Sequence, residues 1–128
     1  MIALPTLAHL EVDPLVAART AARALDDKQG LDIVVLGVGE ALAVVEYFVI
    51  ASGGSSPQVK ALVDEAERQV ADEHGVRPIW VEGSEDRTWV LMDYGSFAVH
   101  VFDVEARGFY ALERLWSDAE RHPWQATD

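Results

Sequence analysis

The sequence predicts an α/β (α+β) fold in which helices pack on a mixed β-sheet of about five strands. Half of the 128 residues are hydrophobic, so the chain can bury a sizeable core as one domain. Short β-branched runs, typical of buried strands, alternate with stretches whose apolar residues recur at helical spacing. Because helices are interposed among the strands, we expect a mixed sheet.

The first half of the chain predicts an N-terminal extension, a helix, two strands and a second helix. Residues 1–12 form the extension. Asp13 suits the cap of the first helix, Pro14 its first position and Gly30 its end. The strands are expected at residues 31–38 and 43–52, around a turn at 39–42, and the second helix runs from about Ser56 to Gly75.

The stretch ASGGSSPQVKAL, residues 51–62, leads from the second strand into the second helix. Glycine-rich turns at this position bind phosphates in many proteins. Lys60, however, does not fit the spacing of a Walker loop, and there is no G-x-G-x-x-G. Ser55 or Ser56 can cap the helix, and Gln58 completes a capping box with Ser55. The stretch therefore predicts a helix start, with a nucleotide-handling enzyme as the alternative function.

Paired carboxylates follow this stretch at the distance where nucleotidyltransferases begin their metal site. Metal-binding carboxylates of that kind should alternate on a strand so that both face one ion. Asp64, Glu65 and Glu67 instead fall on solvent-facing positions of an amphipathic helix. The four histidines are scattered without the spacing of a zinc site. We therefore predict no catalytic residue, no metal and no cofactor.

The second half of the chain predicts an edge strand, a hairpin and a last helix. Pro78 favours an edge or an irregular start for the strand. Gly95 and Ser96 separate two β-rich runs and suit a two-residue hairpin turn. The expected strand spans residues 76–83, the loop 84–87, the hairpin 88–102, the helix 104–116 after a cap at Asp103, and the tail 119–128.

The hairpin turn fixes which side chains share a face of the sheet. One face is wholly apolar and carries Val90, Met92, Tyr94, Phe97, Val99 and Val101. The other face carries Trp89, Leu91, Asp93, Ala98, His100 and Phe102. Either a further helix covers the second face, or its apolar members form an exposed patch beside Asp93 and His100. Such patches are typical of protein contacts.

The charge of the chain narrows the classes of partner. Twenty-two carboxylates against ten Lys and Arg give a net charge of −12. This balance disfavours direct binding to nucleic acid, which needs a cation for each phosphate contact. It suits a basic protein partner, or it serves solubility alone. The absence of cysteine, of a secretion signal and of any apolar run near the ~20 residues of a membrane span predicts a cytoplasmic protein.

From about residue 14 to 118 the chain resembles the ribosomal silencing factor family, also called the Iojap family. The segments that carry the resemblance are ALDDKQGLDIVVLGV, YFVIASGGSSPQVKALVDEAE, VEGSEDRTWVLMDYGSFAVHVF and EARGFYALERLW. The resemblance makes residues 13–118 the silencing factor domain and implies a fold related to nucleotidyltransferases but without their metal carboxylates. It also implies a non-enzymatic function. Family members bind large-subunit ribosomal protein fourteen (uL14), block joining of the small subunit and repress translation under nutrient limitation, and some form homodimers.

The resemblance also assigns residues to the partner surface. Trp89 aligns with the aromatic contact of the family, Asp93 with its acidic contact, and Tyr94 and Gly95 with its hairpin. The full expected set is Trp89, Leu91, Asp93, Tyr94, Gly95, Ser96, His100 and Phe102.

The chain departs from the family pattern at three places. Ser96 stands where members often have Asp, which bears on a second acidic contact. Gly37 replaces a common Asp, and Val45-Glu46 replaces Thr-Asp. These two departures predict that residues 37–46 fold or contact a partner differently.

Overall fold

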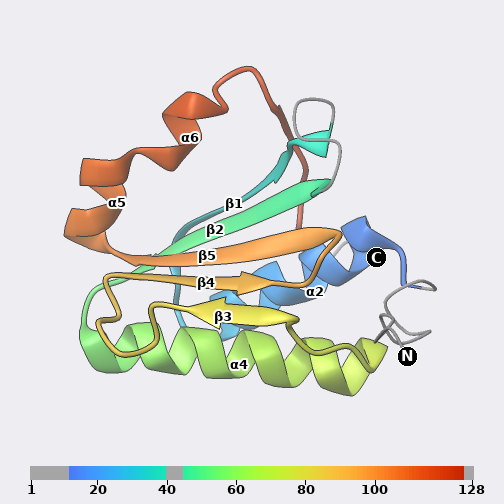
Figure 1. Cartoon of the computed structure of the whole chain (residues 1–128), viewed down its shortest axis with the longest axis horizontal. Coiled ribbons are helices and arrows are strands. Elements are labelled where there is room, and N and C mark those ends of the chain that lie inside the picture. The colour runs from blue at the N-terminus through green and yellow to red at the C-terminus, as the bar shows by residue number, and fades with distance from the viewer. Residues whose placement is uncertain (1–11, 40–44, 126–128) are drawn as a thin grey trace, which may run out of the picture.

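Over residues 12–39 and 45–125, which this computed structural model describes, a six-stranded sheet lies between two groups of helices (Figure 1). Helices α2 and α4 cover one face, and α5 and α6 lie on the opposite side. The expected turn at 39–42 lies almost entirely outside the described residues, as does the N-terminal extension. The elements are α2 (Pro14–Asp27), β1 (Leu31–Gly37), β2 (Tyr47–Gly53), α4 (Ser56–His74), β3 (Trp80–Glu82), β4 (Trp89–Asp93), β5 (Phe97–Asp103), α5 (Val104–Tyr110), α6 (Leu112–Leu115) and β6 (Glu120–Arg121).

The sheet is mixed, as the sequence predicts. Its strand order is β3-β4-β5-β2-β1-β6. Strands β2 and β5 pair in parallel at the centre, and all the other neighbours are antiparallel. A parallel pair needs a crossover connection, and the chain between β2 and β5 supplies one through the long helix α4. The expected strand number of about five becomes six because of β6.

The described end of the chain packs against the sheet. Glu120 and Arg121, in the segment expected to be a polar tail, form the short strand β6 beside β1. The Trp124 indole N–H donates to the Ile33 carbonyl at 3.1 Å. The Arg19 guanidinium on α2 donates to the Pro123 carbonyl at 2.8 Å. Residues 120–124 therefore tie α2 to the outer part of the sheet.

The helix caps explain where α2 and α4 begin. The Asp13 carboxylate accepts the Leu15 N–H at 2.9 Å at the start of α2. At the start of α4, the Ser55 hydroxyl accepts the Gln58 N–H at 3.2 Å. The Gln58 side chain accepts the Gly54 N–H at 2.6 Å. The glycine-serine stretch is thus a capped helix start, as predicted.

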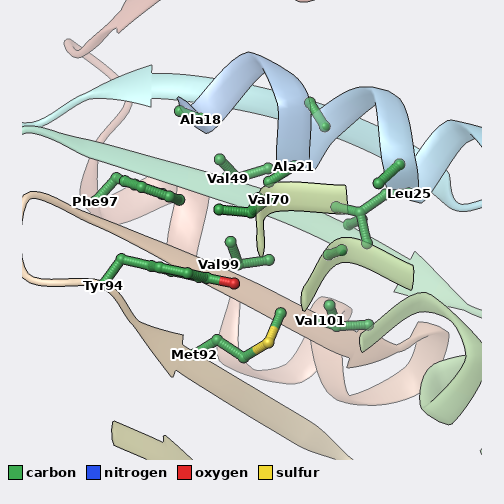
Figure 2. Close-up of a cluster of buried hydrophobic side chains, with 14 of the residues drawn as sticks. Ala18, Ala21, Leu25, Val49, Val70, Met92, Tyr94, Phe97, Val99 and Val101 are labelled. Atoms are coloured by element: carbon green, nitrogen blue, oxygen red, sulfur yellow. The ribbon is translucent and has the colours of Figure 1, made fainter. Parts of the chain in front are cut away.

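The main core fills the space between the sheet and helices α2 and α4 (Figure 2). The expected hairpin register is confirmed, with Met92 opposite Val99 and Val90 opposite Val101. These four side chains point into the core, where the rings of Tyr94 and Phe97 stack with centroids 4.5 Å apart. The buried positions of α2 are mostly alanines, so their small side chains let the helix lie close to α4 and the sheet.

The last helix differs from its expected form. A single helix over 104–116 was predicted, but the chain breaks at Ala111, whose φ is 48°. Arg107 secures the break, because its guanidinium pairs with Glu113 at 2.7 Å and donates to the Ser52 hydroxyl at 3.0 Å. The bend folds α6 back against the second face of the sheet. There Ala106, Leu112 and Trp116 pack on a smaller core of Leu36, Val38, Phe48, Ile50, Ala98 and Phe102.

The predicted strand at 76–83 is shorter than expected. The strand itself spans only Trp80–Glu82, beside β4 at the edge of the sheet, and the Ile79 N–H donates to the Asp93 carbonyl just before it. Pro78 has no N–H to donate to a ladder, which delays the start of the strand. The edge position that Pro78 favours is confirmed.

Replacing Ser55 with alanine is expected to lower the free energy of unfolding by about 1 kcal/mol, because the Gln58 N–H loses its acceptor. Urea denaturation followed by circular dichroism measures this change. Ser84→Ala is a matched control, since the exposed Ser84 hydroxyl makes no hydrogen bond within the described residues, and it should change stability by less than ~0.5 kcal/mol. Equal losses in the two variants would contradict the capping role.

Candidate partner-binding face

The turn between β4 and β5 sets the shape of the candidate site. Its φ is 89° at Gly95 and is not positive at Ser96, and glycine is favoured where a two-residue hairpin turn needs a positive φ. The Asp93 carboxylate accepts the Gly95 N–H at 2.7 Å, and the Tyr94 N–H donates to the Phe97 carbonyl at 2.9 Å. One Asp93 oxygen therefore braces the turn, and the other remains available.

Trp89 is held on three sides at the start of β4. Its indole N–H donates to His100 Nδ1 at 3.1 Å. Its ring stacks on Phe102, with ring centroids 4.9 Å apart and planes 28° apart. It also packs against the ring of Tyr110 on α5, with ring centroids 4.8 Å apart. The side chain is half-buried. Its orientation is therefore fixed while part of its surface stays open to a partner.

His100 lies beneath Trp89 and is only 5% exposed. Because Nδ1 accepts the indole N–H, the neutral imidazole carries its proton on Nε2. Nε2 is buried and has no hydrogen-bond partner within the described residues. Burial lowers the pKa of His100 from 6.5 to about 4. The imidazole is therefore neutral at neutral pH, as acceptance of the Trp89 N–H requires.

The eight residues expected at the partner surface separate into two groups. Trp89, Leu91, Asp93, Gly95 and Ser96 are half-buried and reach the surface along β4 and its turn. Tyr94, His100 and Phe102 are buried. Tyr94 points into the main core, where burial raises the pKa of its phenol. The three buried side chains support the face from beneath and do not lie on its surface.

Two residues of β3 extend this face, and sequence reasoning missed them. Trp80 lies opposite Asp93 and Glu82 lies opposite Leu91, so their side chains emerge on the same side of the sheet. Both are exposed, Trp80 by 58%. We call Trp80, Glu82, Trp89, Leu91 and Asp93 the open strip. In the sequence, the alternation W-V-E after Pro78 indicates that Trp80 and Glu82 share one face of a strand. It does not show with which residues of β4 they pair.

The family departures cluster near one end of the sheet. The Glu46 N–H donates to the Ser96 carbonyl at 2.7 Å, which places the exposed Glu46 beside the hairpin turn. The backbone of residue 46, one of the departures, is therefore bonded to the backbone of residue 96, another of them. At Gly37 an added Cβ would lie 3.1 Å from His122 Nε2, so a side chain there would require the His122 ring to shift slightly.

The glycine-serine stretch uses its polar groups internally. The Ser52 hydroxyl is buried and accepts from Arg107, and the Ser56 hydroxyl accepts from Arg87 at 3.2 Å. Together with the caps of Ser55 and Gln58, these bonds engage three serine hydroxyls and the Gly54 and Gln58 N–H groups within the chain itself.

The carboxylates of α4 pair with cations of the same helix. Asp64 lies 2.6 Å from Lys60. Hydrogen bonds from Arg68 and then Gln69 lower the pKa of Glu65 to about 2. Over the residues that the structure describes, no group of three or more His, Cys, Asp or Glu side chains is placed to hold a metal ion. No helix in the same part of the chain is long and apolar enough to cross a bilayer.

Comparison with known proteins places the chain in a family. Residues 12–128 match the family model described as "Ribosomal silencing factor during starvation". The chain is 43% identical over 101 residues to ribosomal silencing factor RsfS of Bacillus subtilis, covering 79% of this chain and 85% of that one. A more distant relative, mouse mitochondrial assembly of ribosomal large subunit protein 1, is 28% identical and is matched over 46% of its length.

The fold agrees with a solved structure. The crystal structure of a Chromobacterium violaceum protein superposes with a TM-score of 0.78 at 32% sequence identity, over 91% of this chain and 95% of that one. The fold and the sequence similarity therefore agree on one family. This chain belongs to the ribosomal silencing factor family.

Proposed function

We propose that this chain binds the large ribosomal subunit through ribosomal protein uL14 and blocks joining of the small subunit, which represses translation under nutrient limitation. The family name and the name of the mouse relative support a partner on the large subunit. The observation that carries the proposal is the fixed, part-exposed indole of Trp89 beside Leu91 and Asp93 on the open strip.

The proposed mechanism is steric and needs no turnover. A folded body at the subunit interface excludes the other subunit, so affinity and position suffice. Stacking on Phe102 and the hydrogen bond to His100 fix Trp89 before binding, which reduces the entropy that association would cost. Aromatic anchors of this kind carry much of the energy of protein interfaces. In this mechanism Tyr94, His100 and Phe102 act indirectly, by holding the surface in shape.

The charge of the chain supports a basic partner. The net charge is −12, and Asp93 forms no ion pair with the described residues. A carboxylate that folding leaves unpaired can bind a partner's cation without first losing an internal one. Complementary charge also speeds encounter. Binding to the ribosome would place the protein in the cytoplasm.

Wild-type protein is expected to sediment with purified large subunits and to raise the fraction of free subunits when small subunits are added. Trp89→Ala should weaken binding to large subunits by about 2–4 kcal/mol, because the central aromatic anchor is lost. Sedimentation through sucrose gradients and a binding titration measure the two effects. Leu115→Ala, which removes a 76% exposed apolar side chain from α6, is the control and should bind normally.

Failure of the folded wild-type protein to bind large subunits at moderate salt would overturn the proposed function. Normal binding by Trp89→Ala would remove Trp89 from the contact surface. Circular dichroism of each variant checks that the fold is intact. Trp89→Phe, which keeps an aromatic ring but lacks the N–H, should lie between wild type and alanine.

Because of His100, the free energy of unfolding of the wild-type protein should depend on pH. The folded pKa of His100, about 4, lies below the unfolded value of 6.5, so its contribution to stability is present above pH 6.5 and falls as the pH drops toward 4. Between pH 7 and pH 5 the loss is about 2 kcal/mol. His100→Leu should lack this part of the slope. Urea titrations at the two pH values measure it, and identical slopes for the two proteins would contradict a buried, neutral His100.

A further inference from the structure

The edge strand β3 brings an aromatic ring and a carboxylate to the face that carries Trp89. Trp80 on β3 lies directly opposite Asp93 on β4, and Glu82 lies opposite Leu91. Side chains directly opposite each other in an antiparallel pair have Cβ atoms about 5 Å apart. The side chains of Trp80 and Asp93 therefore leave the sheet as neighbours on one side, with Glu82 two residues further along that side.

This part of the face is open. Helices α5 and α6 pack over the central strands, where Phe102 is fully buried. Trp80, by contrast, is 58% exposed at the sheet edge and makes no ring contact with the described residues. Its indole is the largest apolar surface of the open strip and is uncovered in the isolated chain.

The two carboxylates beside Trp80 are unpaired. Asp93 uses one oxygen to accept the Gly95 N–H, and neither Asp93 nor Glu82 forms an ion pair with another described residue. Carboxylates on α4 and α6, such as Asp64 and Glu113, are paired with cations of the chain itself. The open strip thus combines two free negative charges with an exposed aromatic face.

This combination suits a cationic side chain. An arginine or lysine can lie over an indole ring while it donates hydrogen bonds to a neighbouring carboxylate. The excess of carboxylates over the whole chain adds to the attraction of a basic surface. An apolar partner would instead bury Asp93 and Glu82 without compensation, which is costly.

We propose that Trp80, Glu82 and Asp93 form a subsite that takes up one arginine or lysine side chain of a basic protein partner. The subsite extends the Trp89 contact onto the edge strand, and it rests on the proposed function for the identity of that partner. Trp80 supplies the ring, Asp93 the adjacent acceptor, and Glu82 a second negative charge along the strip.

Binding of purified large subunits to Trp80→Ala, Glu82→Gln, Asp93→Asn and the double variant Trp80→Ala/Asp93→Asn tests this subsite. Asparagine at position 93 keeps an oxygen for the Gly95 N–H, so the turn should persist. Trp80→Ala and Asp93→Asn should each weaken binding about tenfold. The double variant should lose far less than the hundredfold that independent contacts give, because both residues serve one cation.

The controls are Leu115→Ala on α6 and Asp26→Asn on α2, both at exposed side chains that do not belong to the open strip. Each should bind within about twofold of wild type. Raising the salt concentration should weaken wild-type binding more steeply than binding by Asp93→Asn, since screening acts on the proposed ion pair.

Three results would overturn the subsite. One is normal binding by Trp80→Ala and Glu82→Gln while the wild type binds large subunits, which leaves the proposed function intact. Another is full additivity in the double variant. The third is loss of self-association in Trp80→Ala, measured by sedimentation velocity, with unchanged binding to large subunits, because the surface would then serve a second copy. If the wild-type protein does not bind large subunits, the proposed function itself is contradicted, and so is the subsite.

Discussion

The antiparallel pairing of β4 with β5 across a two-residue turn is the constraint on which the candidate site depends. Successive side chains of a strand point to opposite faces, so the register Met92–Val99 places alternate residues in the main core. The same register sends Trp89, Leu91 and Asp93 to the other side. A shift of one residue would exchange the two sets. Burial of the apolar set therefore also fixes what the protein presents to a partner.

The two faces of the sheet are covered unequally, and this inequality creates the surface. Alanine-rich α2 and the long α4 fill one face completely along the central strands. On the other face, the break at Ala111 and the Arg107–Glu113 pair confine α5 and α6 to the central strands. Tyr110 at the end of α5 reaches Trp89 and helps to hold it. What lies beyond, toward β3, stays open to solvent.

Much of the fold could be predicted because its signals are local. Asp13 and Ser55 mark helix starts through side-chain oxygens that accept nearby N–H groups, and Gly75 marks a helix end through its positive φ. Gly95-Ser96 fixes the hairpin. The break at Ala111 could not be predicted, because a distant Ser52 helps to stabilise it through Arg107. The burial of His100 and the exposure of Trp80 depend on which strands carry a covering helix. Tertiary packing decides which strands a helix covers, and the local sequence pattern does not.

The short strand β6 affects how readily the edge of the sheet can pair with another polypeptide chain. Glu120 and Arg121 occupy the outer hydrogen-bonding groups of β1 near Leu36 and Gly37. Without them, that border of the sheet would offer unsatisfied N–H and carbonyl groups to any extended polypeptide. Glu120 and Arg121 thus hinder edge-to-edge pairing of this sheet with an extended segment of another chain. Both residues are exposed and charged, and charged side chains on an edge strand disfavour pairing with another chain.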